Sequence, residues 1–121
     1  MAQTAFHTDF GDFVLDETAS HAVITFPAET FFTMVRTLQR AFAAVAESEA
    51  TSCTLDLSGV TYLDSAAISA LLHFEGALRS RGGWVRVVGG LRNGHLARLF
   101  DILGLAKRFP IYESIPAAAQ G

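Results

Sequence analysis

The chain has 121 residues, half of them apolar, and a net charge of −3 from nine basic and twelve acidic side chains. This length suits one domain, spanning residues 1–121, and leaves little room for a second. No apolar stretch approaches the roughly 20 residues that a bilayer-spanning helix needs. No basic patch interleaved with aromatics indicates nucleic-acid binding. We therefore expect a single domain with neither membrane insertion nor direct nucleic-acid contact, and the single cysteine fits a reducing, cytoplasmic location.

The cysteine and histidine residues, which could bind a metal ion, are few, and their spacing does not match that of metal ligands. Cys53 is the only cysteine, so no internal disulfide can form, and its apolar surroundings predict a buried small side chain. No two of the four histidines have metal-ligand spacing. They are His7, His21, His73 and His95. We predict no metal site and no cofactor.

The first third of the chain reads as a hairpin followed by a helix. Residues 10–16 and 21–26 are short, apolar and partly alternating, which predicts two strands joined by a polar turn at 17–20. Pro27 ends the second strand. Thr30 is expected to cap a helix whose apolar residues recur every three or four positions. That stripe consists of Phe32, Val35, Leu38, Phe42 and Val45.

A buried strand and a second helix follow. Residues 53–57 predict the strand, and residues 60–63 continue as an extended apolar loop. Asp64 and Ser65 open a helix that the glycine pair at 82–83 terminates. Its apolar stripe consists of Ile68, Leu71, Leu72 and Leu78.

The last third contains two further strands and a third helix. Residues 84–88 predict a strand, Asn93 is expected to cap a helix, and Gly104 to end it. Residues 109–112 form a short final strand, and residues 115–121 are expected to be a flexible tail. The apolar face of the third helix consists of Leu96, Leu99, Phe100 and Leu103.

The alternation of strands and helices after an initial hairpin predicts an α/β fold. We expect a mixed sheet of four or five strands, with helices packed mainly on one side. The ordered core is expected to cover about residues 8–114 of the single domain.

Ser65 is the strongest candidate for a functional residue, because it begins a helix directly after a strand and a short loop. Helix N-termini carry free N–H groups and a partial positive charge, so a phosphate attached there is stabilised locally. From the residues alone, an ordinary capping serine, with Asp64 sharing the cap, is the favoured interpretation. Asp56 and Asp64 could form an acid–base pair if they converged, but each also has an ordinary structural role.

Motifs of enzymes are missing around these positions. Ser65 is not embedded in the G-x-S-x-G pattern of hydrolases, and the glycine-rich segment 89–94 lacks the lysine of a P-loop. We predict no catalytic residue and therefore a protein that is not an enzyme.

The run TLDLSGVTYLDS at 54–65 resembles the central strand and phosphorylation loop of STAS domains, in the family of anti-sigma-factor antagonists. The similarity continues in RGG at 81–83, LFDILGL at 99–105 and FPIY at 109–112. The resemblance implies a STAS-like fold and a regulator of transcription that acts by binding another protein. By the same resemblance, the expected partner is an anti-sigma factor that is also a serine kinase, bound while Ser65 is unphosphorylated, and a serine phosphatase is expected to reverse the modification.

Carried over by position, the resemblance implies Ser65 as the phosphoacceptor and Asp64 as the adjacent acid. Ser69, one helical turn further on, is the weaker second candidate for the acceptor. The resemblance and the position of the loops place the partner-binding residues around Ser65. They are Pro27, Glu29, Thr61, Tyr62, Ala66, Ala67 and Ser69.

The sequence departs from the family pattern in two places, and the second bears on partner choice. Ala66 and Ala67 stand where the family often has a small residue and then glycine, and FPAE at 26–29 replaces the frequent Gly-Glu-Leu-Asp.

The alternative function is a non-switching STAS subunit of a membrane lipid-transport complex or another multiprotein complex. Homodimerisation stays open at this point.

Overall fold

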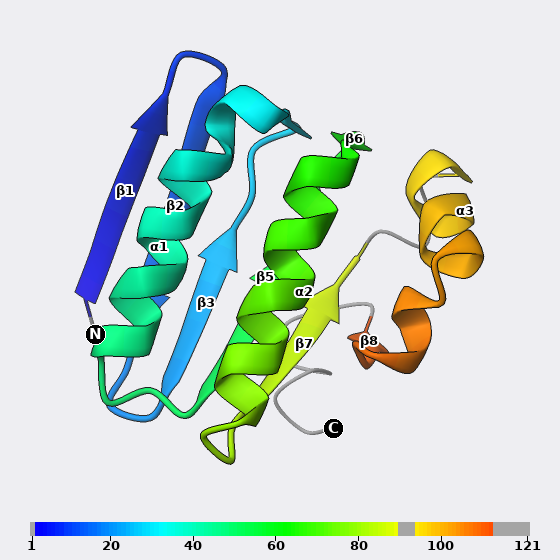
Figure 1. Ribbon diagram of the computed structural model, residues 1–121. Helices are drawn as coiled ribbons and strands as arrows, with labels where there is room; N and C mark the ends of the chain where they lie inside the picture. The colour runs from blue at the N-terminus through cyan, green and yellow to red at the C-terminus, as the bar shows by residue number, and fades with distance from the viewer. Residues whose placement is uncertain (1, 90–93, 113–121) are drawn as a thin grey trace.

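Six strands form one mixed sheet in the computed structural model, which describes residues 2–89 and 94–112 (Figure 1). Their order is β1 (Ala2–Thr8), β2 (Gly11–Glu17), β3 (His21–Thr25), β5 (Ser52–Asp56), β7 (Trp84–Val88) and β8 (Ile111–Tyr112). A separate two-stranded pair consists of β4 (Glu29–Thr30) and β6 (Tyr62–Leu63). The helices are α1 (Val35–Glu47), α2 (Ser65–Arg79) and α3 (Gly94–Ile102), with 3-10 turns η1 (Phe32–Met34) and η2 (Leu105–Lys107).

The connections explain why one face of the sheet carries the helices. β1, β2 and β3 run antiparallel, whereas β3, β5, β7 and β8 are parallel neighbours in chain order. Right-handed crossovers that all advance in one direction along a sheet put their helices on the same face. Figure 1 shows α1 and α2 side by side over that face. The expected α/β class, mixed sheet and one-sided helices are confirmed.

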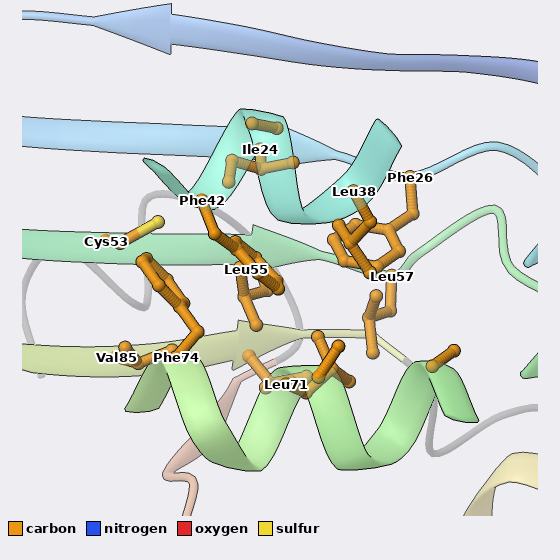
Figure 2. Close-up of a cluster of buried hydrophobic side chains, with 14 of the residues drawn as sticks. Ile24, Phe26, Leu38, Phe42, Cys53, Leu55, Leu57, Leu71, Phe74 and Val85 are labelled. Carbon is orange, nitrogen blue, oxygen red and sulfur yellow. The ribbon is translucent and has the colours of Figure 1, made fainter. Parts of the chain in front are cut away.

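The core lies between α1, α2 and the sheet, as Figure 2 shows. Alternate residues of the strands point into it, including Ile24, Cys53 and Leu55. The rings of Phe42 from α1 and Phe74 from α2 stack at 4.1 Å and join the two helices. The predicted burial of Cys53 is confirmed, and that burial raises the pKa of its thiol.

The sheet has one more strand than the largest expected number, because β1 was not predicted. It pairs with β2 along its full length, from Ala2 opposite Glu17 to Thr8 opposite Gly11. Its side chains are mostly small or polar, and among residues 3–8 only Phe6 packs against the core. Such a strand depends on pairing with its neighbour and shows no apolar alternation of its own.

Two expectations about the first helix are wrong. Thr30 does not cap it, because Thr30 lies in β4 and α1 begins only at Val35, after the 3-10 turn η1. Phe32 does not join the apolar stripe, since it is 71% exposed in η1. The rest of the stripe is confirmed by the burial of Leu38, Phe42 and Val45 and the partial burial of Val35.

The third helix agrees with the expectation in its centre and differs at its end. Leu96 and Phe100 are buried, but Leu103 follows the helix and is 52% exposed. Gly104 follows with a φ of 66°, the left-handed conformation that suits a glycine at a helix end. The predicted cap at Asn93 and the predicted tail at 115–121 lie outside the described residues.

Candidate functional site

Ser65 is the first residue of α2 and is exposed. The helix cap is Asp64, whose side chain accepts a hydrogen bond from the backbone N–H of Ala67 at 2.9 Å. Ser65 therefore does not serve as the cap, contrary to the interpretation favoured from the residues alone. Its hydroxyl has no hydrogen-bond partner within residues 2–89 and 94–112. The hydroxyl is accessible at the positive end of a 15-residue helix.

Asp64 links the start of α2 to the start of η1. While Oδ1 accepts from Ala67, Oδ2 accepts from the backbone N–H of Phe32 at 2.6 Å. Both oxygens of the carboxylate are thus engaged by backbone N–H groups at two helical N-termini, where a negative charge is favourable. This arrangement fixes the loop before Ser65 and the segment that precedes α1 relative to each other.

The two loops predicted to surround Ser65 lie together. The carbonyl oxygen of Ala28 accepts from the backbone N–H of Thr61 at 2.7 Å and from the Thr61 hydroxyl at 3.1 Å. Next to it, β4 and β6 pair in parallel, with Glu29 opposite Tyr62. Glu29, Thr61 and Tyr62 are exposed and Pro27 is half-buried. The structure therefore brings these four predicted residues into one surface beside the start of α2.

The turn between β1 and β2 packs closely against the Pro27 loop of this surface. A Cβ atom on Gly11 would lie 2.6 Å from the Cβ of Pro27, and the φ of Gly11 is 132°. Only glycine allows the turn and the Pro27 loop to approach so closely without a shift. The position of the Pro27 loop is thus determined by β2 as well as by β6.

Aromatic side chains, all exposed except the partly buried Phe31, contact one another at the same end of the molecule. Ring contacts run from Phe10 to Phe31 at 5.6 Å, from Phe31 to Tyr62 at 5.5 Å, and from Tyr62 to His95 at 5.6 Å. We call these four residues the aromatic row. Phe10 is 61% exposed, and Phe32 projects beside the row at 71%. Such exposure of large aromatic rings in one place is typical of protein-binding surfaces.

Except for Tyr62, sequence reasoning did not single out these aromatic residues. The spacing of Phe32 matches the helical period and so predicts a place in the buried stripe. Phe10 was assigned to a strand, and it lies instead in the turn just before β2. The available signal is their position near turns, with Phe10 directly before Gly11 and Phe32 in the segment after Pro27.

The predicted residues within α2 differ in their access to a partner. Ser69 is exposed and Ala66 is partly buried, but Ala67 is fully buried in the core. Ala67 is therefore unavailable as a contact residue, because the third position of α2 faces the sheet. Ser69 stays available as the second candidate acceptor.

Asp56 and Asp64, the carboxylates considered as an acid–base pair, accept hydrogen bonds from different groups. Asp56 Oδ1 accepts from the backbone N–H and the hydroxyl of Ser58, at 3.0 and 2.6 Å, so it stabilises the turn after β5. Within the described residues, no three His, Cys, Asp or Glu side chains are grouped so that they could hold a metal ion. The helices of the described part are all too short or too polar to cross a membrane.

Comparisons with known proteins identify the family and the fold of the domain. The family model of the STAS domain matches residues 12–118. No curated protein sequence matches the chain. An anti-sigma factor antagonist from Mycobacterium paratuberculosis has a similar structure, with a TM-score of 0.77 and 22% identity over 89% of this chain and 90% of that one.

Two further structures extend the comparison. The Bacillus cell fate determinant SpoIIAA in its phosphorylated form matches with a TM-score of 0.71 and 15% identity, over 89% of this chain and 97% of that one. The murine anion transporter Slc26a9 matches with a TM-score of 0.65 and 21% identity, over 87% of this chain but 18% of the transporter. At these identities the structures show a shared fold. The family match covers most of the chain, and the protein belongs to the STAS domain family.

Proposed function

We propose that this protein is an anti-sigma-factor antagonist that is switched by phosphorylation of Ser65. In the unphosphorylated state it binds an anti-sigma factor that is also a serine kinase, and a serine phosphatase restores that state. The observation that carries the proposal is the Ser65 hydroxyl, which is exposed at the start of α2 and has no structural task there. The role requires no catalytic residue, metal or cofactor of the domain itself, and it is a cytoplasmic role.

The local electrostatics favour an on/off change that leaves the fold intact. A phosphate adds about −1.5 to −2 charges at neutral pH. At the N-terminus of α2 this charge gains about 0.3–1 kcal/mol if it stays exposed. The cap at Asp64 is independent of the Ser65 hydroxyl, so the modification does not remove it.

The same charge opposes binding of a partner that packs on the neutral hydroxyl. Burying a dianion without a new cationic partner costs several kcal/mol, and about 1.4 kcal/mol already lowers the affinity tenfold. Asp64 adds a second negative charge next to the phosphate. Phosphorylation therefore releases the partner by desolvation and repulsion rather than by refolding of the antagonist.

The direct test uses the serine kinase of the anti-sigma type from the same cell with labelled ATP. Wild-type protein should take up close to one phosphate, and Ser65→Ala should take up none. Ser69→Ala is the matched control, because Ser69 is also exposed and lies one turn further along the same helix. Full labelling of Ser65→Ala, or loss of label only in Ser69→Ala, would overturn the assignment of Ser65. No labelling and no kinase binding by the wild type would instead favour the non-switching subunit.

A further inference from the structure

Strand β1 forms one border of the main sheet. It is the outermost strand in the order of the sheet, with β2 as its neighbour, and Figure 1 shows it at the blue edge of the molecule. A strand in this position has backbone N–H and C=O groups on its outer side that its own sheet does not pair. At the opposite border, the described part of β8 has two residues, whereas β1 has seven.

The sequence of β1 contains none of the usual devices that prevent edge-to-edge pairing. Natural edge strands are typically protected by charged residues, by proline or by a bulge. The seven residues AQTAFHT include no Lys, Arg, Asp, Glu or Pro. Their register with β2 is continuous, one residue opposite one, so β1 contains no bulge. Gln3, Thr4, Ala5 and His7 are exposed.

This edge is complementary to itself. When two copies of β1 pair antiparallel over their full length, Ala5 lies on the two-fold axis opposite its own copy. Gln3 is then opposite His7 of the second copy, and Thr4 is opposite Phe6. Directly opposed like charges destabilise a strand pair, and this register contains none.

The neighbouring acids do not disturb that register. On the side of the sheet without helices, Asp12 of β2 contacts the His7 ring at 2.7 Å, and Asp16 accepts from the Gln3 amide at 3.1 Å. Both carboxylates are thus one strand behind the edge and already engaged by β1. The outer surface that a second copy meets is polar but carries no carboxylate.

We propose that β1 pairs antiparallel with β1 of a second copy, so that two six-stranded sheets join into one continuous sheet. Seven paired residues make a small interface, so the dimer is weak and depends on concentration. In Figure 1, α1 lies between β1 and α2. The pairing therefore leaves the start of α2 accessible. The proposed dimer does not depend on the function proposed for Ser65.

The first experiment is disulfide trapping with Ala5→Cys. Directly opposed residues of an antiparallel pair have Cβ atoms about 4.5–5.5 Å apart, close to the distance that a disulfide needs. The native Cys53 is fully buried and does not compete. Ala77→Cys, exposed on α2, is the matched control. We expect the Ala5→Cys protein to form a covalent dimer at least about tenfold faster than the Ala77→Cys protein, and equal rates would overturn the proposal.

The second experiment measures association by sedimentation from about 10 μM to about 1 mM, the range in which a weak dimer appears. Wild type should shift from monomer to dimer, and Ala5→Lys should stay monomeric because two ammonium groups would meet at the axis. Ala77→Lys should associate as the wild type does. A wild type that stays monomeric overturns the proposal. An Ala5→Lys protein that still dimerises also overturns it. The same holds if the β1 edge is found to pair only with a different protein.

Discussion

The Asp64 carboxylate accepts a hydrogen bond from the backbone N–H of Phe32 at 2.6 Å, across 32 residues of sequence. Its other oxygen caps α2 through Ala67. One side chain therefore sets both the start of the helix that carries Ser65 and the start of the turn that presents Phe32. The stability of the domain and the shape of the surface around Ser65 depend on the same residue.

Replacement of Asp64 by alanine should lower the free energy of unfolding by about 1–2 kcal/mol, because a helix cap and a second N–H contact are lost together. Urea denaturation of both proteins measures the difference. Glu49→Ala, an exposed acid in the loop after α1, is the control and should change stability by less than about 0.5 kcal/mol. Equal stabilities of Asp64→Ala and wild type would contradict the structural role given to Asp64.

The proposed switch makes a joint prediction for two variants of Ser65. Ser65→Asp should melt close to the wild-type temperature, since a negative charge suits the start of α2, and should bind the kinase at least about tenfold more weakly. Ser65→Ala should bind it constitutively. Calorimetry of unfolding and of binding checks both properties. Unchanged affinity in Ser65→Asp would contradict release by repulsion.

The exposed ring of Phe32 should contribute to partner binding without stabilising the fold. Phe32→Ala is expected to weaken binding of the kinase at least about tenfold, as for an exposed aromatic residue that a partner buries, while the melting temperature is maintained. Ile102→Ala is a well-matched control, since Ile102 is 69% exposed and Phe32 is 71% exposed. If both variants bind equally well, the partner contacts a different surface.

Two buried threonines should respond to the same substitution in opposite ways. The Thr30 hydroxyl is buried without a hydrogen-bond partner among the described residues, so Thr30→Val should raise the free energy of unfolding by up to about 1 kcal/mol. The Thr54 hydroxyl lies 3.0 Å from Nε2 of His21, and Thr54→Val should lower it by about 0.5–1.5 kcal/mol. Chemical denaturation measures both, and a destabilised Thr30→Val would indicate that the hydroxyl has a partner.

The stability of the domain should fall in mild acid through His21. Partial burial, and secondly the charge of Arg86, lower the pKa of His21 in the folded protein. The unfolded chain therefore binds a proton at higher pH, so this contribution is complete above about pH 6.5 and is lost as the pH falls below that value. Unfolding measured from about pH 8 to about pH 5 should show a smaller fall for His21→Gln than for wild type. His73→Gln, an exposed histidine on α2, should behave as the wild type does.

Local sequence patterns predict those strands and helices that have a regular apolar period and end at proline or glycine. The strands β2, β3, β5 and β7 and the helices α1 and α2 are visible as apolar runs or stripes that end at Pro27, at Ser58 with Gly59, and at the glycine pair 82–83. A period of two or of 3.6 residues reflects which side chains meet the core, and the core accounts for most of the stability of these elements.

Features that depend on contacts between distant segments were missed or misassigned. β1 is a strand because β2 pairs with it, and its own residues carry little apolar signal. Thr30 and Phe32 match a helix start in the sequence, but β6 and Asp64 hold this segment in a short strand and a 3-10 turn. Ala67 looks like a surface neighbour of Ser65, yet the orientation of α2 on the sheet turns it into the core.

The candidate site divides in the same way. The position of Ser65 at a helix start, with Asp64 before it, follows from the sequence, because capping depends on a few adjacent residues. The surface around Ser65 is decided only by the tertiary structure. It requires the Ala28–Thr61 hydrogen bonds, the Asp64–Phe32 contact and ring contacts that join Phe10, Phe31, Tyr62 and His95 from four separate segments. Contacts between such segments depend on the topology of the whole sheet, and no local pattern in the chain encodes them.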